Sequence, residues 1–180
     1  MKNKLMLSVA LLMSTSVVSY AVSPTLEVKF RGAVSDVTCE PGLMDDGGVV
    51  ANNIIDFDII TAAMASAKDN DIITDTTKNF KIYAKDAGGT CTPTGANIWV
   101  DAEEQIPDVI KNAGSAKNIG VHLVDGSDRE VIGKETNYTF NTGGPYTVDY
   151  KASLYHIGDS TSPVTVGTIV ASASFTVAYF

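Results

Sequence analysis

Apolar and polar residues alternate along several stretches of the chain, and this alternation predicts β-strands with one buried face. A separate apolar run, Ile98-Trp99-Val100, predicts another strand. The apolar positions of the alternating stretches are Leu26, Val28 and Phe30; Phe80, Ile82 and Ala84; Val121 and Leu123; Val148, Tyr150 and Ala152; and Phe175, Val177 and Tyr179.

Turn-forming residues separate these stretches. Many short strands with turn signals about every ten residues predict an antiparallel all-β sandwich. Two segments differ: residues 61–68, rich in Ala and Met, predict one or two helical turns, and residues 101–111, which contain Pro107, predict a loop. The turn clusters are Pro41-Gly42, Asp46-Gly47-Gly48, Ala87-Gly88-Gly89, Asp125-Gly126-Ser127, Gly143-Gly144-Pro145 and Ser160-Thr161-Ser162-Pro163.

The strands nearest the two ends of the chain are unusual. Residues 22–31 alternate, but no turn signal follows that would fold them back as a hairpin. The strand at Phe175, Val177 and Tyr179 is apolar enough for the middle of a sheet, yet no sequence follows it to supply a neighbouring strand. The pattern therefore predicts a surplus strand at one end and a missing strand at the other. The alternative is that residues 22–31 pair within their own domain.

Residues 1–21 predict a signal peptide. Lys2 and Lys4 precede an apolar run over residues 5–18, and Ser19-Tyr20-Ala21 offers small residues at both positions that a signal peptidase reads. The run is short for a transmembrane helix. We expect export, removal of residues 1–21, and a soluble remaining chain that forms one domain.

Charge and cysteine content fit an exported protein. The formal net charge of -8 at pH 7 argues against nucleic acid as a partner. Cys39 and Cys91 are the only cysteines, and an even number in an oxidising compartment predicts that they pair. Their disulfide would close a loop of about 50 residues. By lowering the entropy of the unfolded chain, it would stabilise the fold by roughly 4 kcal/mol. The alternative is two buried free thiols.

Catalytic and metal-binding patterns are missing from the sequence. It has no nucleophile motif, Gly-rich phosphate loop or metal-ligand spacing, and its only histidines, His122 and His156, lie far apart. Acidic pairs such as Asp56 and Asp58 fit solvated loops better than a cation site. We therefore expect no enzyme activity, no cofactor and no metal. Trp99 fits core or half-buried packing better than a sugar-stacking platform.

Two motifs in the first half of the chain are similar to motifs of a known family. Residues 30–34 read FRGAV, and Cys39 follows the glycine of this motif by seven residues. Cys91 follows a strand over residues 80–83 that reads FKIY. An apolar-polar-Gly motif before the first cysteine, and an F-x-I strand before the second, are both found in that family.

Motifs in the second half identify the family. Residues 118–125 read NIGVHLVD, similar to a family motif N-V-G-V-x-L-x-D, Gly167 lies fourteenth from the end, and Tyr179 is penultimate. In these features the sequence resembles the subunits of chaperone–usher pili, the type 1 and F17-like pilins. It departs from them at residues 55–58, which lack the glycine of the motif V-D-[LF]-G, and in a short N-terminal extension. These departures bear on whether the subunit is a major or a minor component of a pilus.

The resemblance implies an incomplete immunoglobulin-like β-sandwich that lacks its seventh strand. A periplasmic chaperone first fills the resulting groove with one of its own strands, and an outer-membrane usher exchanges that strand for the N-terminal extension of another subunit. The resemblance divides the chain into an extension, residues 22–34, and a pilin domain, residues 35–180. It implies a donor strand with Leu26, Val28, Phe30 and Gly32, and a groove strand with Gly167, Phe175, Val177 and Tyr179.

The function implied is that of a structural subunit of an adhesive fimbria, exported through the periplasm to the cell surface. Its partners would be the chaperone, the usher, other pilus subunits and, at the level of the whole pilus, a host receptor. The alternative is a secreted receptor- or carbohydrate-binding β-sandwich, such as a minor adhesive pilin. Residues 22–180 leave no room for the separate lectin domain of a two-domain tip adhesin, and a self-contained lectin would not need a surplus N-terminal strand.

Overall fold

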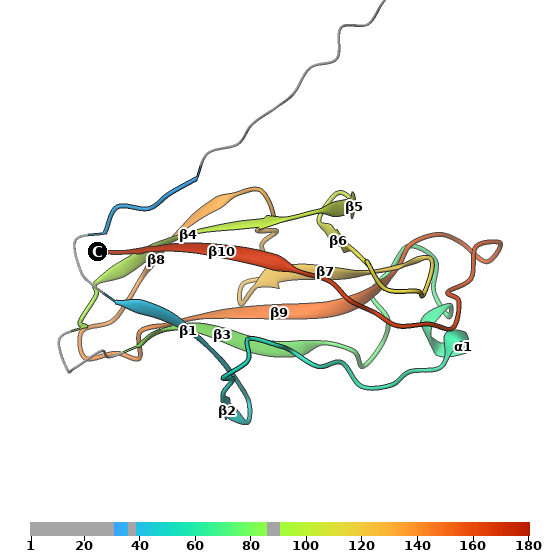
Figure 1. Ribbon diagram of the computed structural model, residues 1–180, viewed down its shortest axis with the longest axis horizontal. Coiled ribbons are helices and arrows are strands. Elements are labelled where there is room, and N and C mark those ends of the chain that lie inside the picture. The colour runs from blue at the N-terminus through green and yellow to red at the C-terminus, as the bar shows by residue number, and fades with distance from the viewer. Residues whose placement is uncertain (1–30, 36–38, 86–90) are drawn as a thin grey trace, which may run out of the picture. The chain divides into compact units, whose positions relative to one another are not determined.

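Two antiparallel sheets and one short helix make up the described part of the chain, which comprises residues 31–35, 39–85 and 91–180 of a computed structural model (Figure 1). The expected signal peptide, and the donor-strand residues Leu26, Val28 and Phe30, lie outside these residues. Within the described ranges, no helix is long and apolar enough to cross a membrane.

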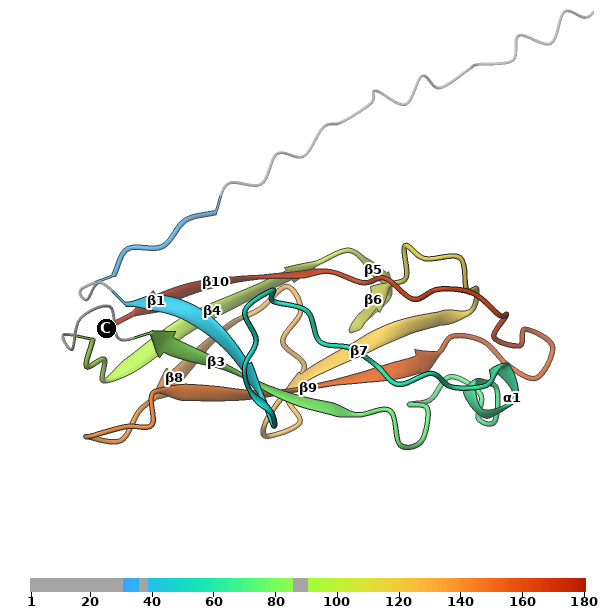
Figure 2. The same ribbon diagram turned by 60° about the horizontal axis from the view of Figure 1, so that its bottom comes forward.

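The larger sheet has the strand order β2-β1-β3-β9-β7-β6-β5, and the smaller sheet has the order β10-β4-β8. Figure 1 and Figure 2 show the two sheets as separate layers, so the fold is an immunoglobulin-like β-sandwich. The strands are β1 Glu40–Asp45, β2 Gly48–Val49, β3 Lys78–Lys85, β4 Gly95–Ala102, β5 Glu104–Ile106, β6 Val109–Lys111, β7 Ile119–Asp125, β8 Glu135–Thr139, β9 Thr147–His156 and β10 Ala173–Tyr179.

The alternating stretches of the sequence form strands β3, β7, β9 and β10, as predicted. Residues directly opposite each other on neighbouring strands share a face of the sheet. Phe80 on β3 lies opposite Tyr150 on β9, and Leu123 on β7 lies opposite Ala152 on β9. These side chains are buried and belong to one continuous core, so the period-two pattern correctly identified the inner face of the larger sheet.

Residues 101–111 form part of β4 and a hairpin of β5 and β6, so the prediction of a loop was wrong. Pro107 and Asp108 occupy the turn, and Ile106 lies opposite Val109. Asp108 takes a positive φ of 62°, a conformation that Asp tolerates better than most residues. Pro107 therefore serves the turn of a hairpin and does not prevent strand formation on either side of it.

Pro41 and Gly42 lie inside strand β1, so the prediction of a turn at this position was also wrong. β1 pairs with β3 along one edge, while β2 covers only its last two residues on the other. An edge strand accepts proline because the missing N–H need not join a ladder. Gly42 lies opposite Tyr83, and a Cβ at Gly42 would come within 2.5 Å of the Tyr83 ring. The glycine thus makes room for an aromatic ring across the strand.

Helix α1, Ala62–Ala65, forms within the predicted helical segment. Its N-cap, Thr61, accepts a hydrogen bond from the Met64 N–H at 3.2 Å through its hydroxyl oxygen. Such caps satisfy backbone donors that a helix leaves unpaired in its first turn. The helix buries only Ala65.

The disulfide joins Cys39 and Cys91, which confirms the predicted pairing. Cys39 immediately precedes β1 of the larger sheet, and Cys91 lies four residues before the start of β4 in the smaller sheet. The bond therefore ties the two layers together at one end of the sandwich.

Candidate functional site

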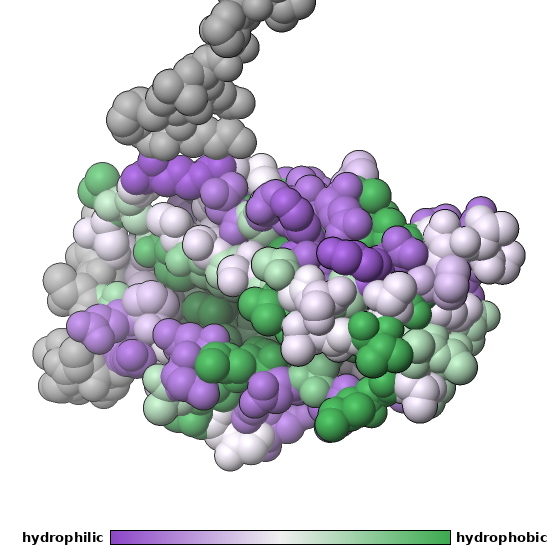
Figure 3. All heavy atoms as spheres, turned by 45° about the vertical axis from the view of Figure 1, so that its right-hand side comes forward, coloured by the Kyte–Doolittle hydropathy of each residue, from purple (hydrophilic) through white to green (hydrophobic). Residues whose placement is uncertain are grey.

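A groove of about 870 Å³ opens between β1 and the segment that leads into β10. Its floor is the inner face of the larger sheet. Figure 3 shows hydrophobic residues at the bottom of a recess on the face of the molecule drawn there. The apolar floor residues are Phe80, Ile82, Ile110, Val121, Leu123 and Ala152. All six belong to the buried core, so the groove gives access to core side chains from outside.

One bank of the groove lies on an extended segment that runs from Gly167 through β10, and the residues of this segment that line the groove end at Phe175. Every second residue of this segment is partly buried against the core, and the residues between them are largely exposed before β10 begins. The inward positions are Ile169, Ala171, Ala173, Phe175 and Val177. This bank therefore behaves as one long strand with an apolar inner face, although only its last part, β10, pairs with β4.

The backbone of this bank has one bonded edge and, as far as residues 31–35, 39–85 and 91–180 show, one edge without a partner strand. The carbonyls of Thr168 and Val170 accept hydrogen bonds from Ala116 and Ala113 at 3.1 and 2.8 Å. Phe180 and Gly95 exchange both of their backbone hydrogen bonds at 3.1 Å. Because such pairs alternate along an antiparallel ladder, the even-numbered residues of the segment face their partners and the odd-numbered residues face the other way.

The backbone N–H and C=O groups of the odd-numbered residues from Ile169 to Tyr179 therefore point away from β4. They lie at the edge where β10 has no neighbouring strand among the described residues. At the far end of this edge the Ser35 hydroxyl donates a hydrogen bond to the Tyr179 carbonyl. This contact confirms the direction of that carbonyl. An open row of backbone donors and acceptors is what an added strand requires.

The second bank is formed by β1 and residues 53–60. Ile55 and Phe57 are partly buried against the core, whereas the neighbouring Ile54 and Ile59 are 53% and 103% exposed. Residues 53–60 belong to no strand, and an ion pair of 2.7 Å between Asp58 and Lys78 links them to β3. The groove thus has apolar side chains on its floor, on both banks and on its outer rim.

Gly167, which the family resemblance selected, lines the groove. A Cβ at this position would lie 2.3 Å from the Ala116 backbone nitrogen. Only glycine lets the segment approach residues 115 and 116 this closely, and the hydrogen bond between Ala116 and Thr168 depends on that approach. Gly167 therefore positions the start of the groove bank.

Phe175 lines the groove and holds β10 against the larger sheet. Its ring centroid lies 5.2 Å from that of Tyr150 and 6.2 Å from that of Phe80, with edge-to-face geometry in both pairs. Val177 and Tyr179 continue the same strand but do not line the groove.

Tyr179 is buried, with 2% of its surface exposed, and among the described residues its hydroxyl has no hydrogen-bond partner. Burial disfavours the charged phenolate and raises the pKa of Tyr179 to about 12. Gly32 lies outside any strand, in an exposed segment.

The opposite side of the sandwich is closed by the chain itself. The connection between β7 and β8 crosses from the larger sheet to the smaller one, with bridges from Glu130 to Val124 on β7 and from Ile132 to Val100 on β4. Val131 and Ile132 in this connection are buried in the core. This covered side, residues 125–134, has no counterpart beside β10 among the described residues.

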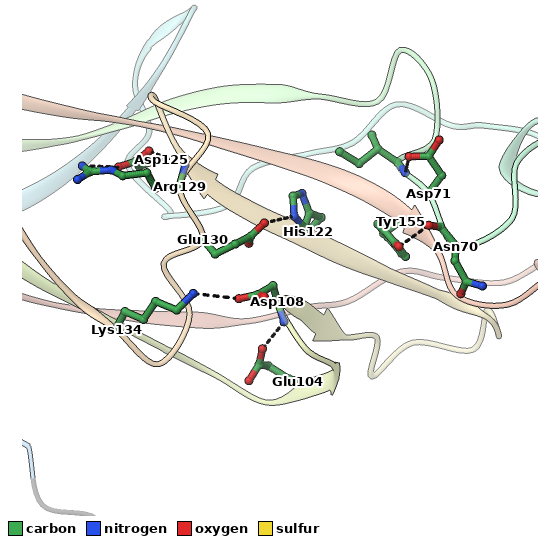
Figure 4. Close-up of polar contacts among 11 residues, drawn as sticks. Asn70, Asp71, Glu104, Asp108, His122, Asp125, Arg129, Glu130, Lys134 and Tyr155 are labelled. Atoms are coloured by element: carbon green, nitrogen blue, oxygen red, sulfur yellow. Dashed lines mark hydrogen bonds and ion pairs between the residues drawn. The ribbon is translucent and has the colours of Figure 1, made fainter.

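Asp125, at the end of β7, holds this crossing in place (Figure 4). Its Oδ1 accepts hydrogen bonds from the Ser127 and Arg129 N–H groups at 2.9 and 3.0 Å, and its Oδ2 accepts from Arg129 Nε at 2.7 Å. Burial disfavours the carboxylate, but these hydrogen bonds outweigh burial and hold the pKa of Asp125 below its usual range. Figure 4 also shows a hydrogen bond of 3.0 Å between His122 Nε2 and Glu130 Oε1, and an ion pair of 3.4 Å between Lys134 and Asp108.

The pattern of the amino-acid sequence predicts one bank of the groove and not the other. The alternation at Phe175, Val177 and Tyr179 identified the strand beside the groove. Within residues 53–60, the sequence shows a departure from a family motif at residues 55–58 and an acidic pair at Asp56 and Asp58, but no strand-like bank was predicted, although Ile55 and Phe57 alternate with these two aspartates. That alternation was the available signal.

Among the comparisons with known proteins, the comparison with solved structures gave matches, and these identify the fold. No model of a protein family matches the sequence, and a search of curated proteins gave no match. The chain is similar to the P pilus rod subunit PapA, with a TM-score of 0.57 and 17% identity over 86% of this chain and 100% of that chain. It is also similar to a chain from a chaperone–usher pilus structure concerned with rod uncoiling, with a TM-score of 0.55 and 17% identity over 88% of this chain and 100% of that chain. The chain therefore has the fold of a chaperone–usher pilus subunit.

Proposed function

We propose that this protein is a structural subunit of a chaperone–usher pilus and that its groove binds a β-strand from another polypeptide. The observation that carries the proposal is the backbone edge from Ile169 to Val177, which has no neighbouring strand among the described residues and runs beside a floor of core side chains. A strand added to such an edge gains main-chain hydrogen bonds, and its alternate side chains fill the apolar pockets beneath it. The resemblance between the fold and the P pilus rod subunit supports this proposal.

The N-terminal extension of a second copy has the pattern that such an occupant needs. Leu26, Val28 and Phe30 repeat with period two, so all three side chains would face the floor of a neighbouring groove. A fully buried apolar side chain contributes roughly 1.5–3 kcal/mol, so the three together contribute about 5–9 kcal/mol before backbone hydrogen bonds are counted. A filament held by such joints would dissociate very slowly.

Before polymerisation the groove must be covered, because an exposed strand edge beside apolar side chains promotes aggregation. A periplasmic chaperone that inserts its own strand would protect the subunit, and an outer-membrane usher would exchange that strand for the extension of another subunit. The completed fimbria would lie on the cell surface and support adhesion to a host receptor.

A synthetic peptide tests the groove directly. A variant that lacks residues 23–30 is mixed with a peptide of residues 22–34, and thermal unfolding is recorded. A peptide present at 100 times its dissociation constant should stabilise the fold by about 2.7 kcal/mol. The matched control is the same peptide with Val28→Asp, which would place an unpaired carboxylate in an apolar pocket and should not stabilise the fold. Equal effects from both peptides, or none from either, would refute groove binding.

Filament assembly tests the donor assignment. The variant that lacks residues 23–30 should still be recovered with a tagged chaperone, because its groove is intact, but it should not extend a filament seen by electron microscopy. Normal pili from this variant would falsify the assignment of the donor strand. A protein that stays monomeric and stable without any chaperone would instead favour the secreted binding module.

A further inference from the structure

Arg31 makes two contacts on the outer face of the smaller sheet. Its guanidinium carbon lies 3.9 Å from the centroid of the Trp99 ring, and its Nη2 lies 3.2 Å from Asp101 Oδ1. Trp99 and Asp101 are two residues apart on β4 and therefore share a face of the sheet. The neighbouring Ile98 and Val100 are each 1% exposed and face the core, so Trp99 and Asp101 face outward. The Arg31 side chain is 29% exposed, so the two contacts cover most of it.

The segment that carries Arg31 is attached to the domain at its two ends. Arg31 contacts β4 at one end, and at the other the Ser35 hydroxyl donates a hydrogen bond to the Tyr179 carbonyl on β10. Between these points the chain is exposed: Val34 is 95% exposed, and nothing lies within 4 Å of a Cβ built on Gly32. Contacts confined to the two ends fix the path of a segment without packing it into the core.

The position of these contacts relative to the groove is informative. The groove lies between β1 and β10, whereas Trp99 lies on the outer face of β4, the middle strand of the smaller sheet. Ser35 bonds to the last carbonyl of the open edge of β10, and Arg31 lies beyond that edge on the outer face. Residues 31–35 therefore lead the chain away from the groove of their own domain.

We propose that Arg31, Trp99 and Asp101 form a clamp that fixes where the N-terminal extension leaves the domain and so sets the orientation between adjacent subunits of a filament. This proposal rests on the proposed function, in which the extension occupies the groove of a neighbour. With Arg31 held against Trp99, residues 31–35 are not a free linker between the domain and the donated strand. A shorter free linker restricts the directions that the neighbouring subunit can take.

An arginine suits this role better than a lysine. The planar guanidinium stacks on the indole ring while its edge still donates to the Asp101 carboxylate, and a lysine ammonium has no flat surface for stacking. Arg31→Lys keeps the charge and should retain only part of the restriction. Arg31→Ala removes both contacts.

The first measurement uses the intact exported subunit. Trp99 is the only tryptophan, so its fluorescence reports the clamp alone. Arg31→Ala should shift the emission to longer wavelength and increase quenching by acrylamide, because the ring loses its cover. The control is Lys81→Ala, which removes an exposed ion pair of 2.6 Å with Asp149 on the larger sheet and should leave the emission unchanged. Unchanged emission in Arg31→Ala would overturn the clamp.

The second measurement uses filaments imaged by electron microscopy. Filaments of Arg31→Ala should form in normal number but show a spread of angles between adjacent subunits severalfold wider than wild type, with Arg31→Lys between them. The thermal stability of the isolated subunit should not change, which separates positioning from a general loss of structure. A shifted emission with an unchanged angular spread would overturn the proposed orienting role. Absence of filaments from the wild-type protein would count against the proposed function. The fluorescence experiment would still test the contact between Arg31 and Trp99, because it does not require filaments.

Discussion

The two sides of this β-sandwich are completed differently. Beside β8, the connection between β7 and β8 crosses from one sheet to the other and buries Val131 and Ile132 in the core. Beside β10, the described residues leave a groove with core side chains at its floor. Both sides have apolar residues directed inward, but only the β8 side has a segment of the described chain lying between the sheets.

The difference shows what a sandwich requires to be closed. The closed side buries apolar side chains and also provides hydrogen-bond partners for polar groups of the crossing, several of them through the contacts of Asp125 with Ser127 and Arg129. The open side already has an apolar floor and, among the described residues, a backbone edge of β10 without a neighbouring strand. A single strand with alternating apolar residues would complete it. The same physical principles therefore stabilise the domain on one side and, in the function that we propose, bind a partner strand on the other.

The largest expected effect comes from introducing a charge on each side of the sandwich and comparing the loss of stability. Ile132→Asp places an unpaired carboxylate in the core of the closed side and should destabilise the fold by more than about 4 kcal/mol, enough to prevent recovery of folded protein. Ile169→Asp, at the partly buried bank of the groove, should cost only about 1 kcal/mol. Ile169→Asp should nevertheless abolish stabilisation by the peptide of residues 22–34. Thermal unfolding with and without peptide measures both effects, and equal loss of stability in the two variants would contradict the distinction.

Tyr179→Ala should have the next largest effect. Truncating this buried aromatic removes its contacts and should cost roughly 3–5 kcal/mol. Because Tyr179 lies at the end of the strand beside the groove, we also expect the subunit to be lost from complexes with a tagged chaperone and degraded in the periplasm. Recovery of the complex at wild-type yield would mean that this strand is not the edge that a chaperone recognises.

Cys39→Ser tests the disulfide that joins the two sheets at one end of the sandwich. Loss of a native disulfide typically costs 2–5 kcal/mol, so periplasmic yield should fall sharply. The wild-type protein, denatured without reduction, should show no reactive thiol, and two labelled thiols per chain would contradict the bond. Cys39→Ser should lower stability with or without the peptide, unlike a substitution in the groove.

Asp125→Asn tests the polar support of the closed side and should cost about 1–3 kcal/mol at neutral pH, because Arg129 loses its charged partner. The pKa of Asp125 is lower in the folded chain than the ordinary value of 3.8, so its contribution to stability is present above that pH. It should be lost as pH falls through the folded pKa. Unfolding measured from pH 6 to pH 2 should therefore show a smaller acid-induced loss in the variant, and parallel curves would argue against this role for Asp125.

Tyr179→Phe should have the smallest effect, within about 1 kcal/mol at neutral pH, because it removes only a buried hydroxyl. Its effect should grow in alkali. The pKa of Tyr179 is raised from 10.0 to about 12, so the unfolded chain ionises first and stability falls as pH rises from 10 to 12. Tyr179→Phe should lose less stability over this window than wild type in denaturant titrations at pH 9 and 12. Identical losses would show that Tyr179 does not titrate as its burial requires.

The amino-acid sequence by itself determined which faces of the main strands are buried. Alternation at Phe80 and Ile82, and at Phe175 and Val177, is a local property, and each strand satisfies it regardless of its neighbours. The disulfide could also be predicted, because the chain has only two cysteines to pair.

Only the tertiary structure decided which strands lie side by side and where none does. Pro41 is acceptable in β1 because β2 covers only the last two residues of β1, and Pro107 lies in the turn of a hairpin whose strand β6 pairs with β7. The groove, and the contact of Arg31 with Trp99, join residues that are far apart in the chain. Side-chain periodicity records burial, but pairing depends on long-range contacts that no local pattern encodes. The sequence therefore predicted a missing strand beside residues 175–179, whereas the second bank of the groove, residues 53–60, became visible only in the folded domain.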